Sequence, residues 1–162
     1  MAALKGRVAL VTGGSRGIGR AIAVSLADAG AAVAVNYLNK ATEAKAVAQT
    51  IHRQGGRAIA IGADVSQAAA VKQMVAGIEH ELGPIDVLVN NAGIAINRVV
   101  DELSEEDFDL TIAVNLKSAF LCTQAVLPGM RSRKWGRIVN ISSGAARGAG
   151  GATTRSSLGS SL

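Results

Sequence analysis

A glycine-rich segment near the start of the chain has the composition of an anion-binding loop. It runs from Thr12 to Gly19, reads TGGSRGIG, and stands between an apolar run and a helical pattern. In that position backbone N–H groups and the positive end of a helix dipole point at an anion. We therefore interpret it as a dinucleotide-binding loop, although three residues rather than one separate its first two glycines. The expected contacts are Gly13, Ser15, Arg16, Gly17, Ile18 and Gly19.

The end of the next apolar run indicates which nucleotide is preferred. An acidic residue about 20 positions beyond the glycines would bind a ribose 2′-hydroxyl and repel a 2′-phosphate. Neutral Asn36 stands at that place, and Arg16 adds a positive charge suited to a phosphate. We expect NADP(H) in preference to NAD(H).

Two further loops follow apolar runs and would lie at the same edge of a sheet. The first holds Asp64 and Val65, and the second holds Asn91, Ala92 and Gly93. An aspartate there can accept a hydrogen bond from an adenine amine, and small residues allow a cofactor to approach the backbone. Each loop alone is also compatible with an ordinary turn, but together with the first loop they indicate one site.

Asn115 interrupts an apolar stripe on a long predicted helix, a stripe expected to face the sheet. The stripe consists of Phe108, Ile112, Asn115, Ala119, Cys122 and Val126. A buried amide without partners would cost about 1–3 kcal/mol, so Asn115 must be hydrogen-bonded. A structural bridge between helix and sheet and a role in a functional site both remain open.

Strands and helices alternate along the chain. Apolar runs predict strands at 8–12, 32–36, 58–61, 86–89 and 137–141. Helical periodicity predicts helices over 18–29, 42–54, 66–82 with Ser66 as its cap, and 104–133 with Ser104 and Asp107 at its start. Continuous apolar strands joined by helices predict a doubly wound α/β domain with a parallel sheet. We place this domain at 1–148, followed by an irregular, disordered tail at 149–162.

Composition argues against several classes of function. The net charge of +5 is scattered without interleaved aromatics, so no nucleic-acid partner is expected. A single cysteine, Cys122, and the isolated His52 and His80 predict neither a disulfide nor a metal site. No apolar run approaches about 20 residues and no secretory segment starts the chain, so we expect a soluble cytoplasmic protein without a membrane span.

Together these motifs resemble the short-chain dehydrogenase/reductase family, particularly its 3-oxoacyl-acyl-carrier-protein reductase-like branch. The resemblance covers residues 5 to about 148 and includes, besides the motifs above, the segment GRIVNISS at 136–143. It implies a Rossmann-type sheet with about five of the usual seven strands present. It also implies an NADP-dependent enzyme, usually tetrameric, that exchanges hydride with a small carbonyl or alcohol substrate such as a 3-oxoacyl thioester.

The resemblance also assigns catalytic roles. Ser143, or less favourably Ser142, matches the serine that hydrogen-bonds the substrate carbonyl, and Asn115 matches the asparagine that keeps a water in the proton relay. The family's Tyr-x-x-x-Lys motif would begin at position 156, where the chain has Ser156 and Ser160 instead.

That departure leaves two hypotheses, because an aliphatic hydroxyl is a far weaker acid than a tyrosine with a pKa of about 10. The chain is either an NADP-dependent reductase truncated before this motif, or a noncatalytic nucleotide-binding module. Such a module would form a homo- or hetero-oligomer through the helix at 104–133. A shifted reading frame in the gene would explain the change of composition near residue 151.

Overall fold

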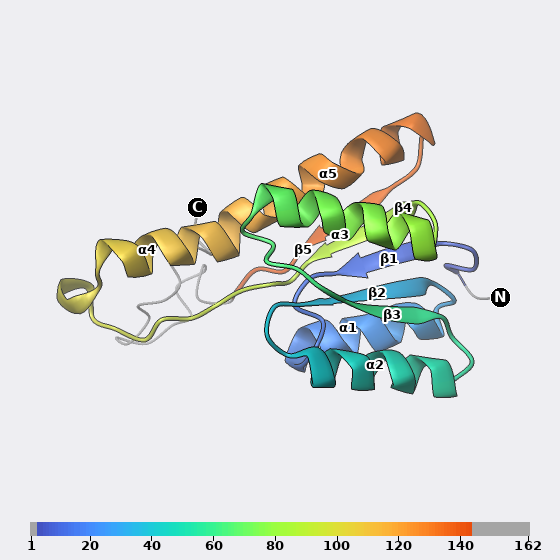
Figure 1. Cartoon of the computed structure of the whole chain (residues 1–162), viewed down its shortest axis with the longest axis horizontal. Helices are drawn as coiled ribbons and strands as arrows, with labels where there is room; N and C mark the ends of the chain where they lie inside the picture. The colour runs from blue at the N-terminus through green and yellow to red at the C-terminus, as the bar shows by residue number, and fades with distance from the viewer. Residues whose placement is uncertain (1–2, 144–162) are drawn as a thin grey trace.

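The chain folds into a five-stranded parallel sheet flanked by helices, which confirms the predicted α/β class (Figure 1). The computed structural model describes residues 3–143. The sheet has the strand order β3-β2-β1-β4-β5. Its strands are β1 (Val8–Val11), β2 (Ala32–Tyr37), β3 (Ala58–Gly62), β4 (Ile85–Asn90) and β5 (Arg137–Asn140). Each predicted strand is present, with its bounds shifted by at most one residue at either end. The predicted tail at 149–162 lies outside the described residues.

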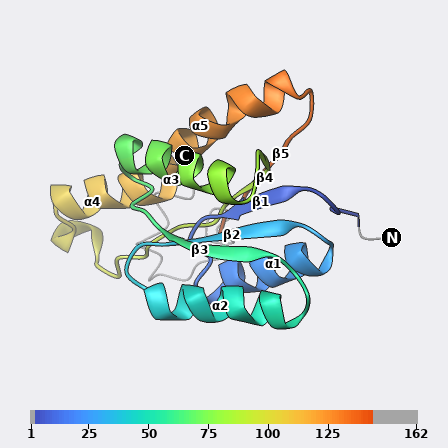
Figure 2. The same cartoon turned by 45° about the vertical axis from the view of Figure 1, so that its right-hand side comes forward.

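Helices cover both faces of the sheet. In Figures 1 and 2, α1 (Gly17–Asp28) and α2 (Ala41–Arg53) lie on one face, and α3 (Ala68–Glu81) and α5 (Ser118–Ser132) lie on the other. Because all strands are parallel, their carboxyl ends share one edge, where β1, β2 and β4 lead into α1, α2 and the loop after β4. This edge carries the residues predicted to bind a nucleotide.

The core contains mainly aliphatic side chains, as the low aromatic content predicts. Strands β1 and β4 are buried along their whole length, which explains their unbroken apolar runs. Their side chains alternate between the two faces: Leu10 and Leu88 pack under α3 and α5, whereas Val11 and Val89 pack under α1 and α2. Each fully buried aliphatic side chain of this size contributes about 1.5–3 kcal/mol.

One local prediction is wrong. Ser66 does not cap α3, whose N-cap is Gln67; instead the Ser66 hydroxyl and amide both donate to Asp64 Oδ1, at 2.7 and 2.9 Å. The preceding carboxylate thus engages Ser66 before the helix begins. Ile18, one of the predicted coenzyme contacts, is 65% exposed in the first turn of α1.

The long helix predicted over 104–133 is continuous but changes its winding. It consists of α4 (Glu105–Ile112), a π-helical turn η2 (Ala113–Lys117) and α5, and Ser104 caps it as predicted by accepting a bond from the Asp107 amide. The stripe expected to face the sheet does so only in α5, through Cys122 and Val126. Phe108 is 39% exposed because α4 extends past the sheet (Figure 1).

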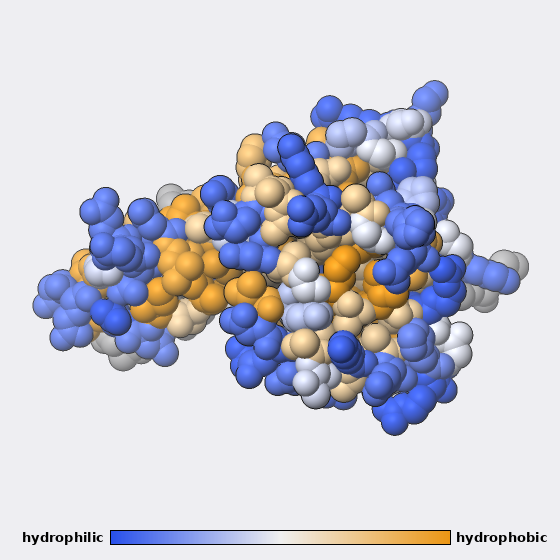
Figure 3. Space-filling model, viewed as in Figure 1, coloured by the Kyte–Doolittle hydropathy of each residue, from blue (hydrophilic) through white to orange (hydrophobic). Residues whose placement is uncertain are grey.

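Apolar surface gathers where this helical arm leaves the body of the molecule (Figure 3). The arm's exposed large apolar residues are Phe108, Leu110, Leu116 and Phe120. Contrary to the expectation from the sequence, the helical run Glu105–Ser132 is long and apolar enough to cross a membrane by length and composition. A mostly buried core helix of a soluble protein passes the same test; here 28% of the apolar window is buried, and α5 buries Leu121, Cys122, Val126 and Met130.

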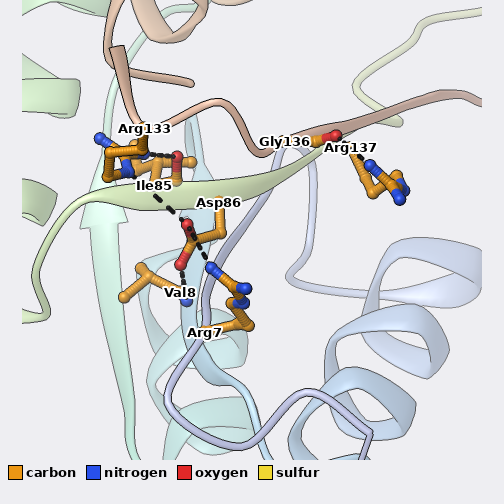
Figure 4. A network of polar contacts seen from close by, with 7 residues as sticks. All are labelled: Arg7, Val8, Ile85, Asp86, Arg133, Gly136 and Arg137. Atoms are coloured by element: carbon orange, nitrogen blue, oxygen red, sulfur yellow. Dashed lines mark hydrogen bonds and ion pairs between the residues drawn. The ribbon is translucent and has the colours of Figure 1, made fainter. Parts of the chain in front are cut away.

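Asp86 forms a network of polar contacts at the amino ends of the strands, opposite the pocket side of the sheet (Figure 4). Its buried carboxylate lies 3.4 Å from Arg7 Nη1 and 3.7 Å from Arg133 Nε, and it accepts a bond from the Val8 amide. The Arg7 guanidinium in turn stacks 3.7 Å from the centre of the Trp135 ring. This network joins β1, β4 and the turn between α5 and β5. The amino ends of the strands therefore carry stabilising contacts, and the carboxyl ends carry the residues predicted to bind a nucleotide.

Candidate functional site

A pocket of about 590 Å³ lies at the carboxyl ends of β1, β2 and β4. Every nucleotide-binding residue predicted from the sequence lines it. Those residues are Gly13, Ser15, Arg16, Gly17, Ile18, Gly19, Asn36, Asp64, Val65, Asn91, Ala92 and Gly93. The structure thus brings together residues from three separate loops and from the end of β2, as parallel topology requires.

The three glycines that define the pattern of the first loop, Gly13, Gly17 and Gly19, differ in why each must be glycine. Gly13 and Gly17 have φ of 62° and 53°, a region that favours glycine. A Cβ on Gly19 would overlap the Gly13 carbonyl oxygen and lie 2.5 Å from Asn91 Nδ2. Gly17, in contrast, faces open space. The first and third glycines therefore allow protein packing, and the middle one leaves room over the loop.

The start of α1 offers hydrogen-bond donors. Its N-cap is Arg16, whose side chain cannot accept a bond and makes no capping bond. The first N–H groups of an α-helix have no partner within the helix. An anion above Gly17 would satisfy these groups, and the exposed Arg16 guanidinium would add a positive charge.

Thr12 connects the glycine loop to the loop after β4, a role that the sequence analysis missed. Its buried hydroxyl accepts bonds from the amides of Asn91 and Ala92, at 2.9 and 3.0 Å, and donates to Val89 O. The Asn91 side-chain nitrogen Nδ2 in turn donates hydrogen bonds to the carbonyl oxygens of Thr12 and Gly13. The two loops are therefore fixed relative to each other before any ligand binds.

Asn36 lines the pocket, but its side chain serves the protein itself. It is 2% exposed; Oδ1 accepts from the Gly13 amide, and Nδ2 lies within 3.4 Å of the carbonyl oxygens of Tyr37, Ile61 and Ala63. Its amide therefore holds β2, β3 and the glycine loop together. Tyr37, expected just after the strand, is the last residue of β2 and packs on Gly62.

The loop after β3 contributes Asp64 and Val65. Val65 is buried in the core beside α3. Asp64 is half-buried, and its Oδ1 is engaged by Ser66, which orients the carboxylate. Among the described residues that line the pocket it is the single carboxylate, against two cations, Arg16 and Lys40.

Asn115 lies in the π-helical turn η2 and makes a paired contact with Ile94. Its Oδ1 accepts from the Ile94 amide at 2.8 Å, and its Nδ2 donates to the Ile94 carbonyl at 3.0 Å. A Cβ on Gly93 would lie 3.4 Å from the same Oδ1. Asn115 thus holds the loop after β4 against the helix, and its neighbour Val114 lines the pocket.

Ser142 and Ser143 follow β5 and are both exposed. The preceding residue, Ile141, donates its amide to Asn90 O at 2.9 Å, which aligns this segment with the end of β4. Asn90 Nδ2 also donates to Asn140 Oδ1 at 2.8 Å. The two serines therefore leave the sheet at the same edge as the pocket. Ser156 and Ser160 lie outside the described residues.

Metal ligands do not gather in the part of the chain that the structure describes: no three His, Cys, Asp or Glu side chains there could hold an ion. His52 instead accepts a bond from the Ala58 amide through Nε2. The pocket wall includes residues that the sequence analysis did not assign to the site: Tyr37, Leu38, Asn39, Lys40, Ala63, Ile94 and Val114. The turn after β2 contributes three of them, Leu38, Asn39 and Lys40, and nothing in its composition distinguishes it from a solvent-exposed turn.

Comparison with known proteins identifies relatives of this chain. The family model described as short chain dehydrogenase matches residues 7–155. A 3-oxoacyl-acyl-carrier-protein reductase of Synechocystis sp. is 47% identical over 143 residues, which cover 88% of this chain and 58% of the relative. A reductase of the same name from Staphylococcus epidermidis is 44% identical over 83% of this chain and 55% of its own length. This chain therefore spans little more than half the length of these relatives.

Solved structures agree with this comparison. A blue fluorescent protein from a metagenomic library, solved in complex with NADPH, superimposes with a TM-score of 0.89 at 41% identity, over 98% of this chain and 65% of that one. A metagenomic short-chain oxidoreductase in complex with NADP gives a TM-score of 0.88 at 36% identity, over 98% and 71%. These matches confirm both the fold and the resemblance inferred from the motifs.

Proposed function

Because this chain belongs to the short-chain dehydrogenase family, we propose that the pocket at the carboxyl ends of β1, β2 and β4 binds NADP(H). The observation that carries the proposal is the first loop. It combines open space over Gly17, uncapped N–H groups at the start of α1, and the Arg16 guanidinium. These features suit a pyrophosphate and a phosphorylated ribose.

The donor set supports this fit. Asn36 supplies no charge at the end of β2, and Arg16 favours a 2′-phosphate, so NADP(H) is preferred over NAD(H). The loop with Asp64 and Val65 and the loop with Asn91, Ala92 and Gly93 are both assigned to the adenine and its ribose. Relatives of this chain have been solved with NADPH and NADP bound, which supports the same preference.

We assign the chain's ancestral chemistry to hydride transfer between NADPH and a carbonyl substrate, for which a 3-oxoacyl thioester is the model. NADPH supplies the hydride when bound. The Ser143 hydroxyl donates a hydrogen bond to the substrate carbonyl oxygen, and Asn115 holds the loop around Ile94 against the helix. Protonation of the product oxygen requires an acid, and the Ser156 hydroxyl is a weak one.

Titration of the full chain with NADPH and NADH tests the coenzyme assignment. We expect NADPH to bind at least about tenfold more tightly than NADH, since a charged hydrogen-bonded pair contributes about 1.5–3 kcal/mol and 1.4 kcal/mol is tenfold. Arg16→Gln should remove most of this difference. Arg20→Gln makes the same charge change one turn along α1, at an exposed position outside the pocket wall, and should preserve it. Folded protein that binds neither coenzyme would refute the proposal.

A noncatalytic role is the second candidate, favoured by Ser156 and Ser160 in place of the family's tyrosine and lysine. NADPH consumption with a panel of ketones and 3-oxoacyl thioesters separates the two candidates. Binding with turnover supports the reductase, and binding without turnover supports the nucleotide-binding module. For either role we propose self-association, or association with a related chain, through the helix at 104–133, whose arm exposes four large apolar side chains.

A further inference from the structure

The strand β3 forms one of the two outer edges of the sheet in the part of the chain that the structure describes. Ala58 at its start is buried, Gly62 at its end is exposed, and the three residues between them are partly exposed. Figure 3 shows apolar surface between α3 and α2, where β3 runs in Figure 1.

The sequence of β3 does not protect this edge. The strand reads AIAIG, without a charged side chain or a proline, whereas β5 at the other edge contains Arg137 and Asn140. Natural proteins usually protect an edge strand with charged residues or proline, because its outward backbone groups can pair with another strand. The β3 edge therefore has the composition of a strand that can accept a partner.

The backbone of β3 points alternate residues toward β2 and away from it. The carbonyl of Arg57, just before β3, accepts a bond from a β2 amide, and the amide of Ala63, just after β3, donates to a β2 carbonyl. In a parallel ladder the N–H and C=O groups of the intervening even-numbered residues point the other way. Ala58, Ala60 and Gly62 therefore form a row of outward donors and acceptors.

His52 covers one end of this row. It lies in the last turn of α2, and its Nε2 accepts the outward N–H of Ala58 at 3.2 Å. The imidazole thus satisfies one donor of the edge and occupies the space beside it. Ala60 stands at the centre of the row, and Gly62 stands at the end away from His52.

We propose that the outer edge of β3 is an interaction surface to which a second copy of this chain adds its own β3 in antiparallel orientation. With the twofold axis at Ala60, the two Ala60 residues face each other, and Ala58 of each copy faces Gly62 of the other. These are hydrogen-bonded pairs, in which two opposite residues exchange both N–H···O bonds. The contact joins two five-stranded sheets into one.

The charges that flank β3 favour a second copy in this orientation. Arg57 stands directly before the strand, and Asp64 stands two residues after its end. Antiparallel pairing places the cationic end of each strand beside the anionic end of the other, whereas parallel pairing would bring like charges together. Because a short strand buries little surface, we expect a weak dimer that depends on concentration. This surface is separate from the arm formed by α4 and the start of α5.

His52 limits the pairing. The Ala58 N–H cannot donate to His52 and to Gly62 of the second copy at the same time, and the ring must leave the edge before the outer pairs form. Removal of the ring frees one donor in each copy. Substitution of His52 by alanine should therefore strengthen association.

Amide hydrogen exchange of the full chain, followed by NMR over a series of concentrations, measures pairing at this edge. All samples carry Phe120→Glu, so that the arm does not contribute to association. We expect the protection of the Ala60 and Gly62 amides to rise with concentration. Sedimentation equilibrium then measures association in three variants, and circular dichroism verifies that each variant is folded.

Ala60→Pro removes the central outward N–H without removing a bond to β2, and we expect it to weaken association at least about tenfold. His52→Ala should strengthen association about tenfold, since two donors become free in the dimer. His80→Ala is the matched control: it removes an exposed histidine from the last turn of α3 and should change association by less than about twofold.

The proposal is overturned if the Ala60 and Gly62 amides stay unprotected at every concentration, because the edge is then free. It is also overturned if their protection is equal at every concentration, because another part of the same chain then covers the edge. Association of folded Ala60→Pro at full strength would exclude β3 as the interface. If that variant does not fold, equal association of His52→Ala and His80→Ala excludes it instead. Coenzyme binding enters none of these outcomes, so the proposed function is tested separately.

Discussion

Asn36 occupies the position expected to determine coenzyme preference, but its hydrogen bonds stabilise the fold. Its amide nitrogen faces three carbonyl oxygens, and its amide oxygen accepts from the glycine loop. In the simplest interpretation of this position, an aspartate would redirect the coenzyme preference toward NAD(H). In this chain the same carboxylate would be buried against carbonyl oxygens, so its first effect would be on stability.

We therefore predict that Asn36→Asp lowers the free energy of unfolding by about 3 kcal/mol or more at pH 7, because it buries an unpaired charge. Asn39→Asp is the matched control, since Asn39 lines the same pocket in an exposed turn. That variant should change stability by less than about 0.5 kcal/mol and weaken NADPH binding. Urea unfolding measures the stability of both variants, and titration with NADPH measures binding. Equal stability of the two variants would contradict the role given to Asn36.

At the residue scale the sequence predicted where polar groups gather better than it predicted what each one does. Asn36, Asp64 and Asn91 all line the pocket as expected, because parallel strands bring their carboxyl ends together. Their hydrogen bonds were not predictable, since Asn36 reaches across to β3 and Asn91 reaches back to Thr12. Lys40 was missed for the same reason: a lysine in a turn has no signal until the turn is placed beside the pocket.

At the scale of elements, the helix that carries Asn115 departs from the regular periodicity. The π-helical turn η2 makes the helix complete each turn with more residues than an α-helix does. On either side of that turn the helix has different surroundings: α5 packs on the sheet and buries Cys122, whereas α4 extends past the sheet and leaves Phe108 exposed. Periodicity predicted the extent of the helix and its Ser104 cap, but a single irregular turn leaves no mark in a pattern of apolar residues.

The arm formed by α4 and the start of α5 should mediate self-association. Phe120 is 59% exposed on this arm, and burial of a phenylalanine against a second copy stabilises by about 1.5–3 kcal/mol per chain. We predict that Phe120→Glu weakens association at least about tenfold in sedimentation equilibrium. Gln49→Glu adds the same charge at an exposed position of α2, on the opposite face of the sheet, and should have no effect. A chain that is monomeric at all concentrations would contradict the proposed interface.

At the scale of the whole molecule, strands from both halves of the sheet meet in one core under α3 and α5. That cluster includes Leu10, Leu88 and Cys122, which come from β1, β4 and α5. The alternation of apolar runs and helical patterns was sufficient to predict this architecture, because buried parallel strands and their crossover helices have few other arrangements. The ion-pair network of Asp86 with Arg7 and Arg133 was not predicted, since the two arginines come from opposite ends of the described chain.

Cys122 tests whether this core unfolds as a unit. Its side chain is fully buried, and burial raises the pKa of the Cys122 thiol to about 12. In the unfolded chain the thiol loses its proton above a pKa of about 8.5–9, while in the folded chain it keeps the proton until about pH 12. The unfolded state therefore binds fewer protons in this range. Stability should fall as pH rises above about 9, by at most about 1.4 kcal/mol per pH unit.

Cys122→Ala isolates this contribution from the lysines and the tyrosine that titrate in the same range. We predict that the unaltered chain loses unfolding free energy relative to Cys122→Ala as pH rises from 8 to 10.

Because Cys122 is the single cysteine, its reaction with a thiol reagent at pH 8 measures how often the core around it opens. If the core opens only by global unfolding, the labelling rate across a urea series gives the same free energy as circular dichroism. Faster labelling would mean that α5 separates from the sheet before the rest of the molecule unfolds. The ion pair between Asp86 and Arg133, at the carboxyl end of α5, would then not prevent this opening.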